Sequence, residues 1–465
     1  MMSRKVSGKD RFETEVYEMN DGDAIAACVH RSLVVFAVVS LVGVLFLSVG
    51  VGSVAAQSAP DCSSVTYNGD GTEANPYEVG DVDQLQCINE QGLDANYVQV
   101  SDIDASGTSL WNGGKGFDPI GDADFDEDTE FRGSFDGSGY NIIDLTIARE
   151  RQVEQETLGI FGAVGSGGKI NSVSVVDANI TGFIQVGGLV GRNDRGVISN
   201  SSVSGSVDGI FDVGGLVGQN LVGTVSSSYS TASIEGQGSV GGLVGENTFG
   251  TVKESYATGS VDGSNEVGGL AGANYGTISE SYASGSVDRG DPAGGLVGQN
   301  GQDAIPPDDG SEGTLIDSYW DTERTGQSEA IGQEGGEDDG EAKGGDSIVS
   351  GQVEGLTMSE MTGSEAASNM DSFDFATTWK TVPSEYPMLS WESDSGADGS
   401  PVEGVSDELW TAVTQDDGSD GLSLADLGNA IQQYQANPSD ADVDGAVINL
   451  SDLGSLIQYY RTEAA

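Results

Sequence analysis

A repeat of 27 residues runs through the middle of the chain and constrains its fold more than any other feature. Pairs of glycines each open a GGLVG or GGLAG segment, and successive pairs lie 27, 27, 27 and 26 residues apart. A fixed period of this length is typical of a solenoid, in which every repeat forms one coil. Propeller blades need about 40 residues or more, so the period argues against a propeller. The pairs are Gly187-Gly188, Gly214-Gly215, Gly241-Gly242, Gly268-Gly269 and Gly294-Gly295.

The composition of each repeat indicates strands rather than helices. Short runs of Val, Ile and Leu alternate with Gly and Asn, and no amphipathic helical pattern is present. This predicts three short strands per coil joined by tight turns. We expect glycine to supply the positive φ angles at the corners and the apolar side chains to stack in columns inside. The predicted fold of this part is all-β, a right-handed parallel β-helix (solenoid).

Two polar or aromatic columns recur in register with the glycines. One Asn per repeat is predicted to form a ladder of side-chain amides between coils. Tyr229, Tyr256 and Tyr282 form a second column, which is either a structural ladder or a surface on which sugars stack. Tyr256 shares a face with Val252 only if Glu254 does too, so a bulge or corner is expected between them. The Asn column contains Asn193, Asn220, Asn247, Asn274 and Asn300.

A carboxylate column follows the same spacing through Asp208, Glu235, Asp262 and Asp288. It is interpreted mainly as a solvated acidic face, with cation binding or a paired general acid and base as the alternatives. A polysaccharide lyase would need basic residues close to these acids. Residues 182–300 contain only four Lys and Arg residues, which share no column. No catalytic residue is therefore predicted.

The charge of the chain restricts its partners. It has 18 basic and 75 acidic residues and a net charge of −57. Nucleic acid is excluded as a partner because phosphate binding needs a basic surface. Acids spread along the whole chain favour a surface adapted to concentrated salt, and thus a halophilic, archaeal source, with a surface that collects cations as the alternative.

The N-terminal region indicates export. Residues 33–54 form an apolar run that ends near Ala55 and Ala56, as in a signal peptide, and a retained membrane anchor is the alternative. The single His, His30, precedes this run, so a cleaved protein has no His-dependent catalytic or metal site. Cys62 and Cys87 follow the run and are predicted to form a disulfide, with two free thiols as the alternative. The predicted location is extracellular or at the cell surface.

The pattern GGLVGxN…GTIxxSYAxGSV resembles the GLUG repeat of bacterial and archaeal surface proteins. Residues 75–79, 117–121 and 131–137 resemble the segment that precedes such repeats, and residues 318–321 and 386–391 resemble the segment that follows them. The resemblance covers residues 68–392. It implies a β-helix-like architecture and adhesin-type surface proteins, without implying a particular activity.

The last 60 residues contain two similar acidic loops, each followed by a helical pattern, and they resemble a dockerin, a small all-α module built from two calcium-binding halves. One loop is a residue shorter than the usual twelve and the other a residue longer. The Ser/Thr pair used against a cohesin is replaced by Leu424-Ala425 and Leu450-Ser451, which counts against a cohesin partner. A cap that binds cations diffusely is the alternative. The resemblance and the spacing assign Ca²⁺ to Asp416, Asp420, Ser423, Asp426, Asp440, Asp442, Asp444, Asn449 and Asp452.

These observations predict a secreted or cell-surface structural and adhesion protein that binds polysaccharide or a cell-surface glycan and docks to a protein through its C-terminal module. A β-helix polysaccharide hydrolase or lyase is the rival. The predicted segments are an N-terminal extension with the signal peptide or anchor (1–56), a cap with the first coils (57–157), the repeats (158–300), a last coil with an acidic disordered loop and cap (301–392), a linker (393–405) and the dockerin-like module (406–465).

Overall fold

The computed structural model describes residues 58–122, 129–149, 157–301, 313–334 and 348–392, together with the backbone of residues 442–443 and 446–447. The chain divides into two compact units, residues 1–56 and 57–465. The first unit, which holds the apolar run, lies outside the described residues, and the description below concerns the second. None of the helices in the described part of the chain is long and apolar enough to cross a bilayer.

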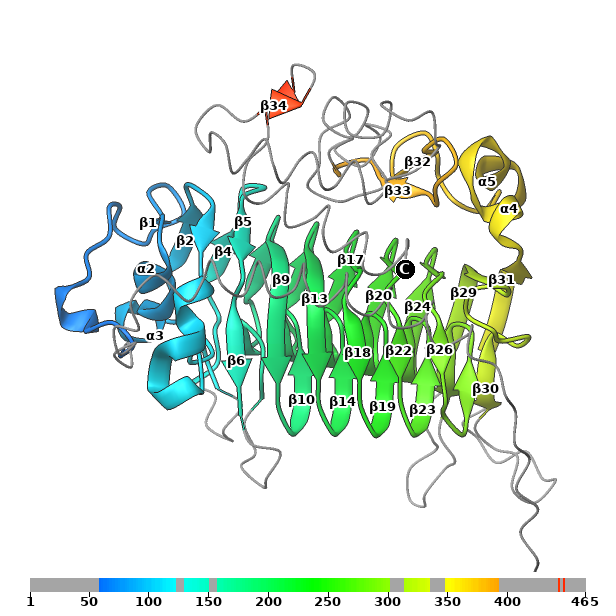
Figure 1. Cartoon of the computed structure of the whole chain (residues 1–465), viewed down its shortest axis with the longest axis horizontal. Helices are drawn as coiled ribbons and strands as arrows, with labels where there is room; N and C mark the ends of the chain where they lie inside the picture. Colours follow the sequence, from blue (N-terminus) through cyan, green and yellow to red (C-terminus); the bar gives the residue numbers. More distant parts are fainter. Residues whose placement is uncertain are drawn as a thin grey trace, which may run out of the picture. The chain divides into compact units, whose positions relative to one another are not determined.

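The second unit contains a parallel β-solenoid, which confirms the predicted architecture (Figure 1). Within the described residues, 26 strands belong to one continuous sheet and five form a second sheet along one edge of the coils. In this second sheet the first glycines of successive GG pairs lie in register, from Gly187 to Gly294. Its strands are β10 (Ile184–Gly187), β14 (Phe211–Gly214), β19 (Gly238–Gly241), β23 (Asn265–Gly268) and β27 (Ala293–Gly294).

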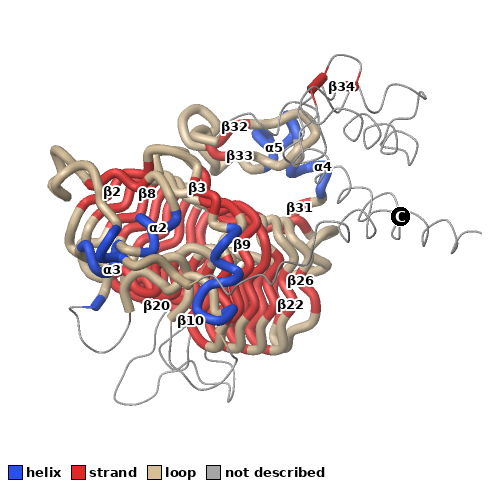
Figure 2. The backbone as a smooth tube through the Cα atoms, turned by 60° about the vertical axis from the view of Figure 1, so that its left-hand side comes forward, coloured by secondary structure: helices blue, strands red, loops and turns tan. Residues whose placement is uncertain are grey.

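Each repeat forms more strands than the three that the sequence predicts. The coil that begins with β14 continues through four further strands and then returns to β19. Figure 2 shows these strands side by side with their equivalents in the neighbouring coils. The remaining repeat strands are β11 (Val190–Asp194), β12 (Val197–Ser199), β13 (Ser202–Asp208), β15 (Val217–Leu221), β16 (Thr224–Ser226), β17 (Tyr229–Ser230), β18 (Ser233–Glu235), β20 (Val244–Lys253), β21 (Tyr256–Ala257), β22 (Val261–Asp262), β24 (Ala271–Ser279), β25 (Tyr282–Ala283), β26 (Val287–Asp288) and β28 (Val297–Asn300).

Most corners of the repeats are formed by residues other than glycine, so the prediction of glycine corners is wrong for them, although Gly205, Gly290 and Gly351 do have positive φ angles. Three columns of non-glycine residues have φ near +50° to +60°. Backbone hydrogen bonds between coils hold these residues in place; for example, the Val222 N–H donates to Thr248 O at 2.8 Å. Such bonds compensate for a backbone conformation that L-residues rarely adopt. The columns are Gln185, Asp212, Ser239 and Glu266; Arg195, Val222 and Phe249; and Ser172, Asn200, Ser227, Glu254, Glu280 and Asp317.

The paired glycines are needed because neighbouring backbone approaches them closely. A Cβ atom on Gly214 would lie 2.1 Å from Val217 O, and one on Gly242 would lie 2.2 Å from Gly269 O. Real Cβ contacts are never this short, so a side chain at either position would push the coils apart. The paired glycines therefore recur in every repeat because of close backbone packing and not because of positive φ angles.

The corner that follows the Asn column absorbs changes in coil length. Phe249 and Gly250 occupy this corner in one coil, whereas the next coil has only Gly276 between Tyr275 and Thr277, which explains the 26-residue spacing. Residues 302–312 and 335–347 also follow positions of the Asn column. Although residues 301–355 break the sequence period, their strands stay in register with the preceding coil. These strands are β29 (Thr314–Asp321), β30 (Ile331–Glu334) and β31 (Ile348–Leu356).

Apolar columns fill most of the interior of the solenoid, as predicted. One Leu per repeat, directly after each glycine pair, is completely buried, and Val and Ile columns accompany it. Burying a side chain of this size contributes about 1.5 to 3 kcal/mol, and every coil adds a similar set. The Leu column contains Leu189, Leu216, Leu243, Leu270 and Leu296.

The coils before the repeats belong to the same sheet, and short helices accompany them. The sequence did not predict the helices α2 and α3; α2 begins where the Asp81 side chain accepts a hydrogen bond from the Gln84 N–H at 2.8 Å. The elements are η1 (Cys62–Ser64), β1 (Tyr77–Val79), α2 (Val82–Gln86), α3 (Ile88–Gln91), β2 (Asn96–Gln99), β3 (Ile103–Asp104), η2 (Ser106–Gly114), β4 (Ser134–Asp136), β5 (Asn141–Ile143), β6 (Thr146–Ala148), β7 (Phe161–Val164), β8 (Lys169–Asn171) and β9 (Ser174–Thr181).

After β31 the chain forms α4 (Met358–Met361), α5 (Gly363–Asn369) and the antiparallel pair β32 (Trp379–Lys380) and β33 (Met388–Leu389). This segment packs on the outside of the coils and forms a second apolar core with them. Farther on, only the backbone of the antiparallel pair β34 (Asp442–Val443) and β35 (Ala446–Val447) is described.

Candidate functional site

The Asn column forms the predicted ladder inside the solenoid. Each side-chain Nδ2 donates to the Oδ1 of the next Asn, at 2.8, 2.8, 2.8 and 2.7 Å. All five side chains are completely buried. A second buried ladder was not predicted: the hydroxyl of Ser228 accepts from the Ser201 N–H, and this bond recurs at Ser255, Ser281 and Ser318. Both ladders satisfy buried polar groups and so have a structural role.

The Tyr column is a stacked ladder on the outside of the coils. Tyr229 and Tyr256 have ring centroids 4.8 Å apart at an interplanar angle of 3°, and Tyr256 and Tyr282 are 4.9 Å apart at 4°. Tyr319 continues the column in the next coil. Glu254 adopts φ +50° between Val252 and Tyr256, which confirms the expected corner.

The segment from Met370 to Glu392, which we call the strap, covers most of this ladder. Trp379 packs against Tyr256 and Tyr282 with centroids 6.1 and 5.7 Å away, and Phe373 contacts Tyr319 at 5.2 Å. The Tyr282 hydroxyl donates to Pro387 O at 2.7 Å. The covered tyrosines are therefore part of a core, as the structural interpretation of this column requires, and their faces are not open to sugars.

A buried carboxyl group joins the strap to the ladder. Glu392, only 7% exposed, accepts hydrogen bonds from the Tyr256 hydroxyl at 2.9 Å and from the Leu389 N–H at 2.5 Å. Burial raises the pKa of Glu392 to about 7, although these hydrogen bonds oppose the shift. Tyr386 makes a second link by donating to the buried Asp321 carboxylate. The strap is thus attached by polar contacts as well as by packing.

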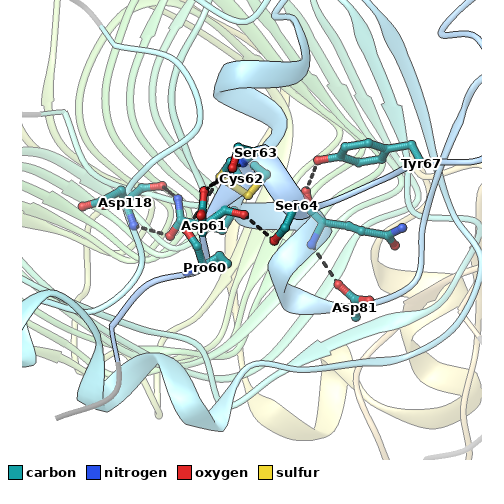
Figure 3. Close-up of a disulfide and its surroundings, with 11 residues drawn as sticks. Pro60, Asp61, Cys62, Ser63, Ser64, Tyr67, Asp81 and Asp118 are labelled. Carbon is teal, nitrogen blue, oxygen red and sulfur yellow. Dashed lines mark hydrogen bonds between the residues drawn. A yellow bond between two sulfur atoms is a disulfide. The ribbon is translucent and has the colours of Figure 1, made fainter.

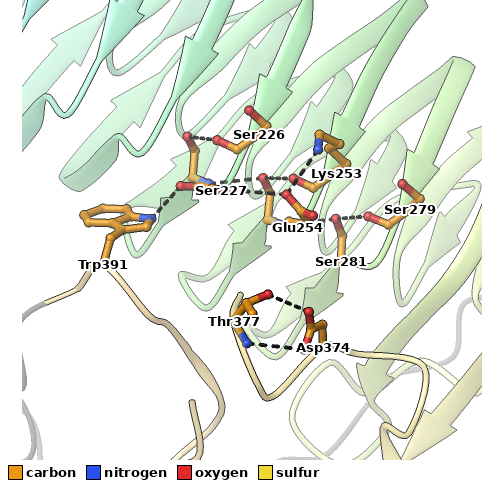
Figure 4. Close-up of polar contacts among 11 residues, drawn as sticks. Ser226, Ser227, Lys253, Glu254, Ser279, Ser281, Asp374, Thr377 and Trp391 are labelled. Atoms are coloured by element: carbon orange, nitrogen blue, oxygen red, sulfur yellow. Dashed lines mark hydrogen bonds and ion pairs between the residues drawn. The ribbon is translucent and has the colours of Figure 1, made fainter. Parts of the chain in front are cut away.

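The ladder becomes accessible at its N-terminal end, where the described part of the strap ends. Trp391 is 40% exposed, and its ring lies 5.9 Å from that of Tyr229 at an angle of 28°. Its Nε1–H donates to Ser227 O at 2.9 Å (Figure 4). Sequence reasoning placed Trp391 in the segment after the repeats but could not find this contact, because 164 residues separate the two partners.

The structure brings the predicted carboxylate column together. Asp208, Glu235, Asp262 and Asp288 pair in register on successive strands. Glu235 and Asp288 are exposed, and Asp262 forms an ion pair with Arg289 from the following coil. Exposed carboxylates of this kind fit the solvated face favoured by the sequence.

A second group of carboxyl side chains was missed by the sequence reasoning. Asp212 and Glu266 occupy the same corner column two coils apart, near Glu246 and Tyr275. Burial, with smaller contributions from Glu246 and Glu266, raises the pKa of Asp212 to about 7. Glu246 accepts hydrogen bonds from Gln219 at 2.9 Å and Thr248 at 2.5 Å. Comparison of the same corner position across repeats would have revealed the two aligned acids.

The predicted cysteine pair lies at the start of the described chain. The Sγ atoms of Cys62 and Cys87 are bonded at 2.00 Å, linking the first short 3₁₀ helix to the end of α2 (Figure 3). Cys87 is buried, and the hydroxyl of Tyr67 donates to Gln84 O at 2.5 Å beside it. This crosslink closes the N-terminal end of the unit.

The predicted calcium ligands lie outside the residues whose side chains the structure describes. Only the backbone of Asp442 is included, in β34. The assignment of Ca²⁺ to Asp416, Asp420, Ser423, Asp426, Asp440, Asp442, Asp444, Asn449 and Asp452 therefore stays a prediction, as do the linker and the dockerin-like module.

Comparison with known proteins supports the repeat assignment. The family model described as the GLUG motif matches residues 184–208 and 236–262. Halomucin from Haloquadratum walsbyi is 37% identical over 158 residues, which cover 33% of this chain and 2% of halomucin. A protein from Evansella cellulosilytica, whose name describes it as a Gly-rich membrane protein, is 35% identical over 145 residues, covering 30% of this chain and 16% of that protein. The chain thus spans a small part of each relative.

One solved structure has a similar chain path. It is a crystal structure from Bacteroides ovatus that carries the name immunoglobulin A1 protease. It is 19% identical, with a TM-score of 0.48 over 70% of this chain and 95% of that one. A likeness at this level supports no inference about activity.

Proposed function

We propose that this protein is an exported, non-enzymatic surface protein whose solenoid presents a repetitive face for adhesion to polysaccharide or to cell-surface glycans. The observation that carries this proposal is the repetition itself. Acidic side chains recur once per coil along one outward column, from Asp208 through Glu235 and Asp262 to Asp288. A regular row of this kind suits a repetitive polymer, which offers the same groups at regular intervals.

The proposal also rests on charge and on the relatives. A net charge of −57 suits a protein that stays soluble in concentrated salt, where repulsion between carboxylates is screened to within about 3 Å at 1 M. Halomucin and the Gly-rich membrane protein are similar to about a third of this chain, and their names point to surface or membrane material. We extend a surface location and a halophilic origin to this chain on these grounds.

A glycan array in molar NaCl tests the adhesion proposal. Purified residues 57–465 should bind a subset of polysaccharides without releasing reducing ends or unsaturated products. Turnover abolished by Asp208→Asn or Asp212→Asn would instead establish the rival hydrolase or lyase. A protein that binds no glycan on the array would refute the adhesion function.

We further propose that residues 406–465 dock the protein to a partner in a calcium-dependent way. The support is the sequence spacing of Asp440, Asp442 and Asp444, which lets one loop direct three carboxylates toward a cation. Calcium at constant ionic strength should raise the melting temperature of the full chain more than magnesium does, and Asp444→Ala should remove most of the difference. Equal effects of calcium, magnesium and matched NaCl would leave only diffuse screening.

A further inference from the structure

The outward column that carries the tyrosines changes character where the described strap ends. Tyr229, Tyr256, Tyr282 and Tyr319 occupy it in the coils that the strap contacts. In the two coils before Tyr229 the same column carries Ser202 and then Ser174. Trp391 stacks on the first of the tyrosines, so it marks the boundary between the aromatic and the hydroxyl part of the column.

The Trp391 ring at this boundary is fixed in place and still accessible. Its Nε1–H is satisfied by Ser227 O at 2.9 Å, and the ring lies beside Tyr229, yet 40% of the residue remains exposed. Trp379, the other tryptophan of the strap, is almost completely buried. An aromatic face held rigidly against solvent can stack on a flat apolar partner with little loss of side-chain entropy.

The neighbouring surface is polar, with amides and hydroxyls on the side of the preceding coils. Carboxylates lie at its margins, because the Asn171 Nδ2 donates to Asp136 Oδ1 at 3.4 Å and the Ser227 hydroxyl donates to Glu254 Oε2 at 3.3 Å. Asn200 occupies the corner that Ser227 holds one coil later, and its Nδ2 donates to Asn171 Oδ1 at 3.0 Å. The Ser199 hydroxyl donates to the same oxygen at 3.0 Å. Amide and hydroxyl groups thus follow the aromatic face, one set per coil, and they can exchange hydrogen bonds with the hydroxyl groups of a sugar chain.

We propose that Trp391 and Tyr229, together with the Asn200 and Asn171 amides, form a binding site for a neutral polysaccharide, one sugar ring of which stacks on Trp391. This inference rests on the proposed adhesion function and gives it a location and a ligand class. The polymer is neutral because a chain with a net charge of −57, which places the Asp136 and Glu254 carboxylates beside this site, repels polyanions.

The test is retention of purified residues 57–465 on cellulose and chitin particles, as neutral probes, and on alginate beads, as an acidic probe, all in molar NaCl. The wild type should bind at least one neutral probe and not alginate. Trp391→Ala should weaken that binding about tenfold and Trp391→Phe should restore part of it. Asn200→Ala, which leaves the strap untouched, should weaken it about threefold. Phe249→Ala is the matched control, since Phe249 is 62% exposed on another corner and should have no effect.

The outcomes separate this site from the general function. If Trp391→Ala and Asn200→Ala bind as tightly as the wild type, or if only alginate is bound, the site is refuted and adhesion stands. If no probe is bound and the glycan array is also blank, both proposals fail. Trp391→Ala could release the strap, which a red shift of the fluorescence of the buried Trp379 would reveal. In that case the binding of Asn200→Ala tests the site: weaker binding by this variant supports the site, and unchanged binding refutes it.

Discussion

The Asn ladder allows a prediction whose size can be worked out from the structure. Asn247 lies in the middle of the ladder: it donates to Asn274 Oδ1 at 2.8 Å and accepts from Asn220 Nδ2 at 2.8 Å. Asn247→Ala removes both bonds from a completely buried site. Each bond contributes about 1 kcal/mol net, and two buried partners lose one bond each, so the free energy of unfolding should fall by about 2 to 4 kcal/mol.

Asn193 provides the matched control at the end of the ladder. It is equally buried and donates one ladder bond, to Asn220 Oδ1 at 2.8 Å, while its own Oδ1 has no hydrogen-bond partner among the described residues. Asn193→Ala creates a similar cavity but breaks one ladder bond, so its effect should be about half as large. Urea unfolding at fixed NaCl, followed by far-ultraviolet circular dichroism, measures both variants. Equal losses for the two would refute the view that each rung stabilises the stack.

Three further predictions concern the strap, the glycines and the disulfide. The pKa of Glu392 is higher in the folded protein than in the unfolded chain, so its carboxyl group stabilises the fold below about pH 4.5 and loses this effect as the pH rises through about 7. Glu392→Gln should therefore flatten the fall in melting temperature between pH 5 and 8. An unchanged slope would contradict the raised pKa of Glu392. Gly242→Ala should lower the melting temperature sharply, since the added Cβ would lie 2.2 Å from the Gly269 backbone oxygen. Gly107→Ala should leave the melting temperature unchanged, because a Cβ there meets nothing within 4 Å. Equal melting temperatures for the two variants would exclude close packing as the reason for Gly242. Cys62→Ser opens a crosslink between residues 25 apart in the sequence and should lower the free energy of unfolding in urea by about 3 kcal/mol. An unchanged free energy of unfolding would show that the disulfide does not stabilise the solenoid.

The sequence was sufficient for the stacking but not for the conformation within a coil. In a solenoid the repeat spacing determines which residues lie opposite one another on neighbouring coils. The column of glycines from Gly187 to Gly294 and the Asn ladder could therefore be predicted from residue positions alone. The corner at Glu254 could be expected from the spacing of Val252 and Tyr256, but the corner at Val222 could not, because nothing in the identity of Val222 indicates a positive φ. Those angles are imposed by hydrogen bonds to the next coil, which a single repeat does not contain.

The candidate site was hidden for a related reason. The Tyr column was visible in the sequence, and whether it was structural or bound sugars depended on what lies above it. The strap that decides this contacts Tyr256 from a position 136 residues later in the chain, outside the repeat period. A repeat pattern can predict which residues share a column but not which non-repetitive segment covers that column.

The corner after the Asn column has a consequence for how such a protein can change over evolutionary time. One coil lacks a residue there, and in later coils residues 302–312 and 335–347 follow the equivalent positions in the sequence, while the described strands on either side keep their register. Insertions and deletions at this position are decoupled from the hydrogen-bonded frame of the solenoid. Lineages could therefore diversify one edge of the molecule through short in-frame additions, and the same corner offers a position at which a foreign epitope could be grafted for display.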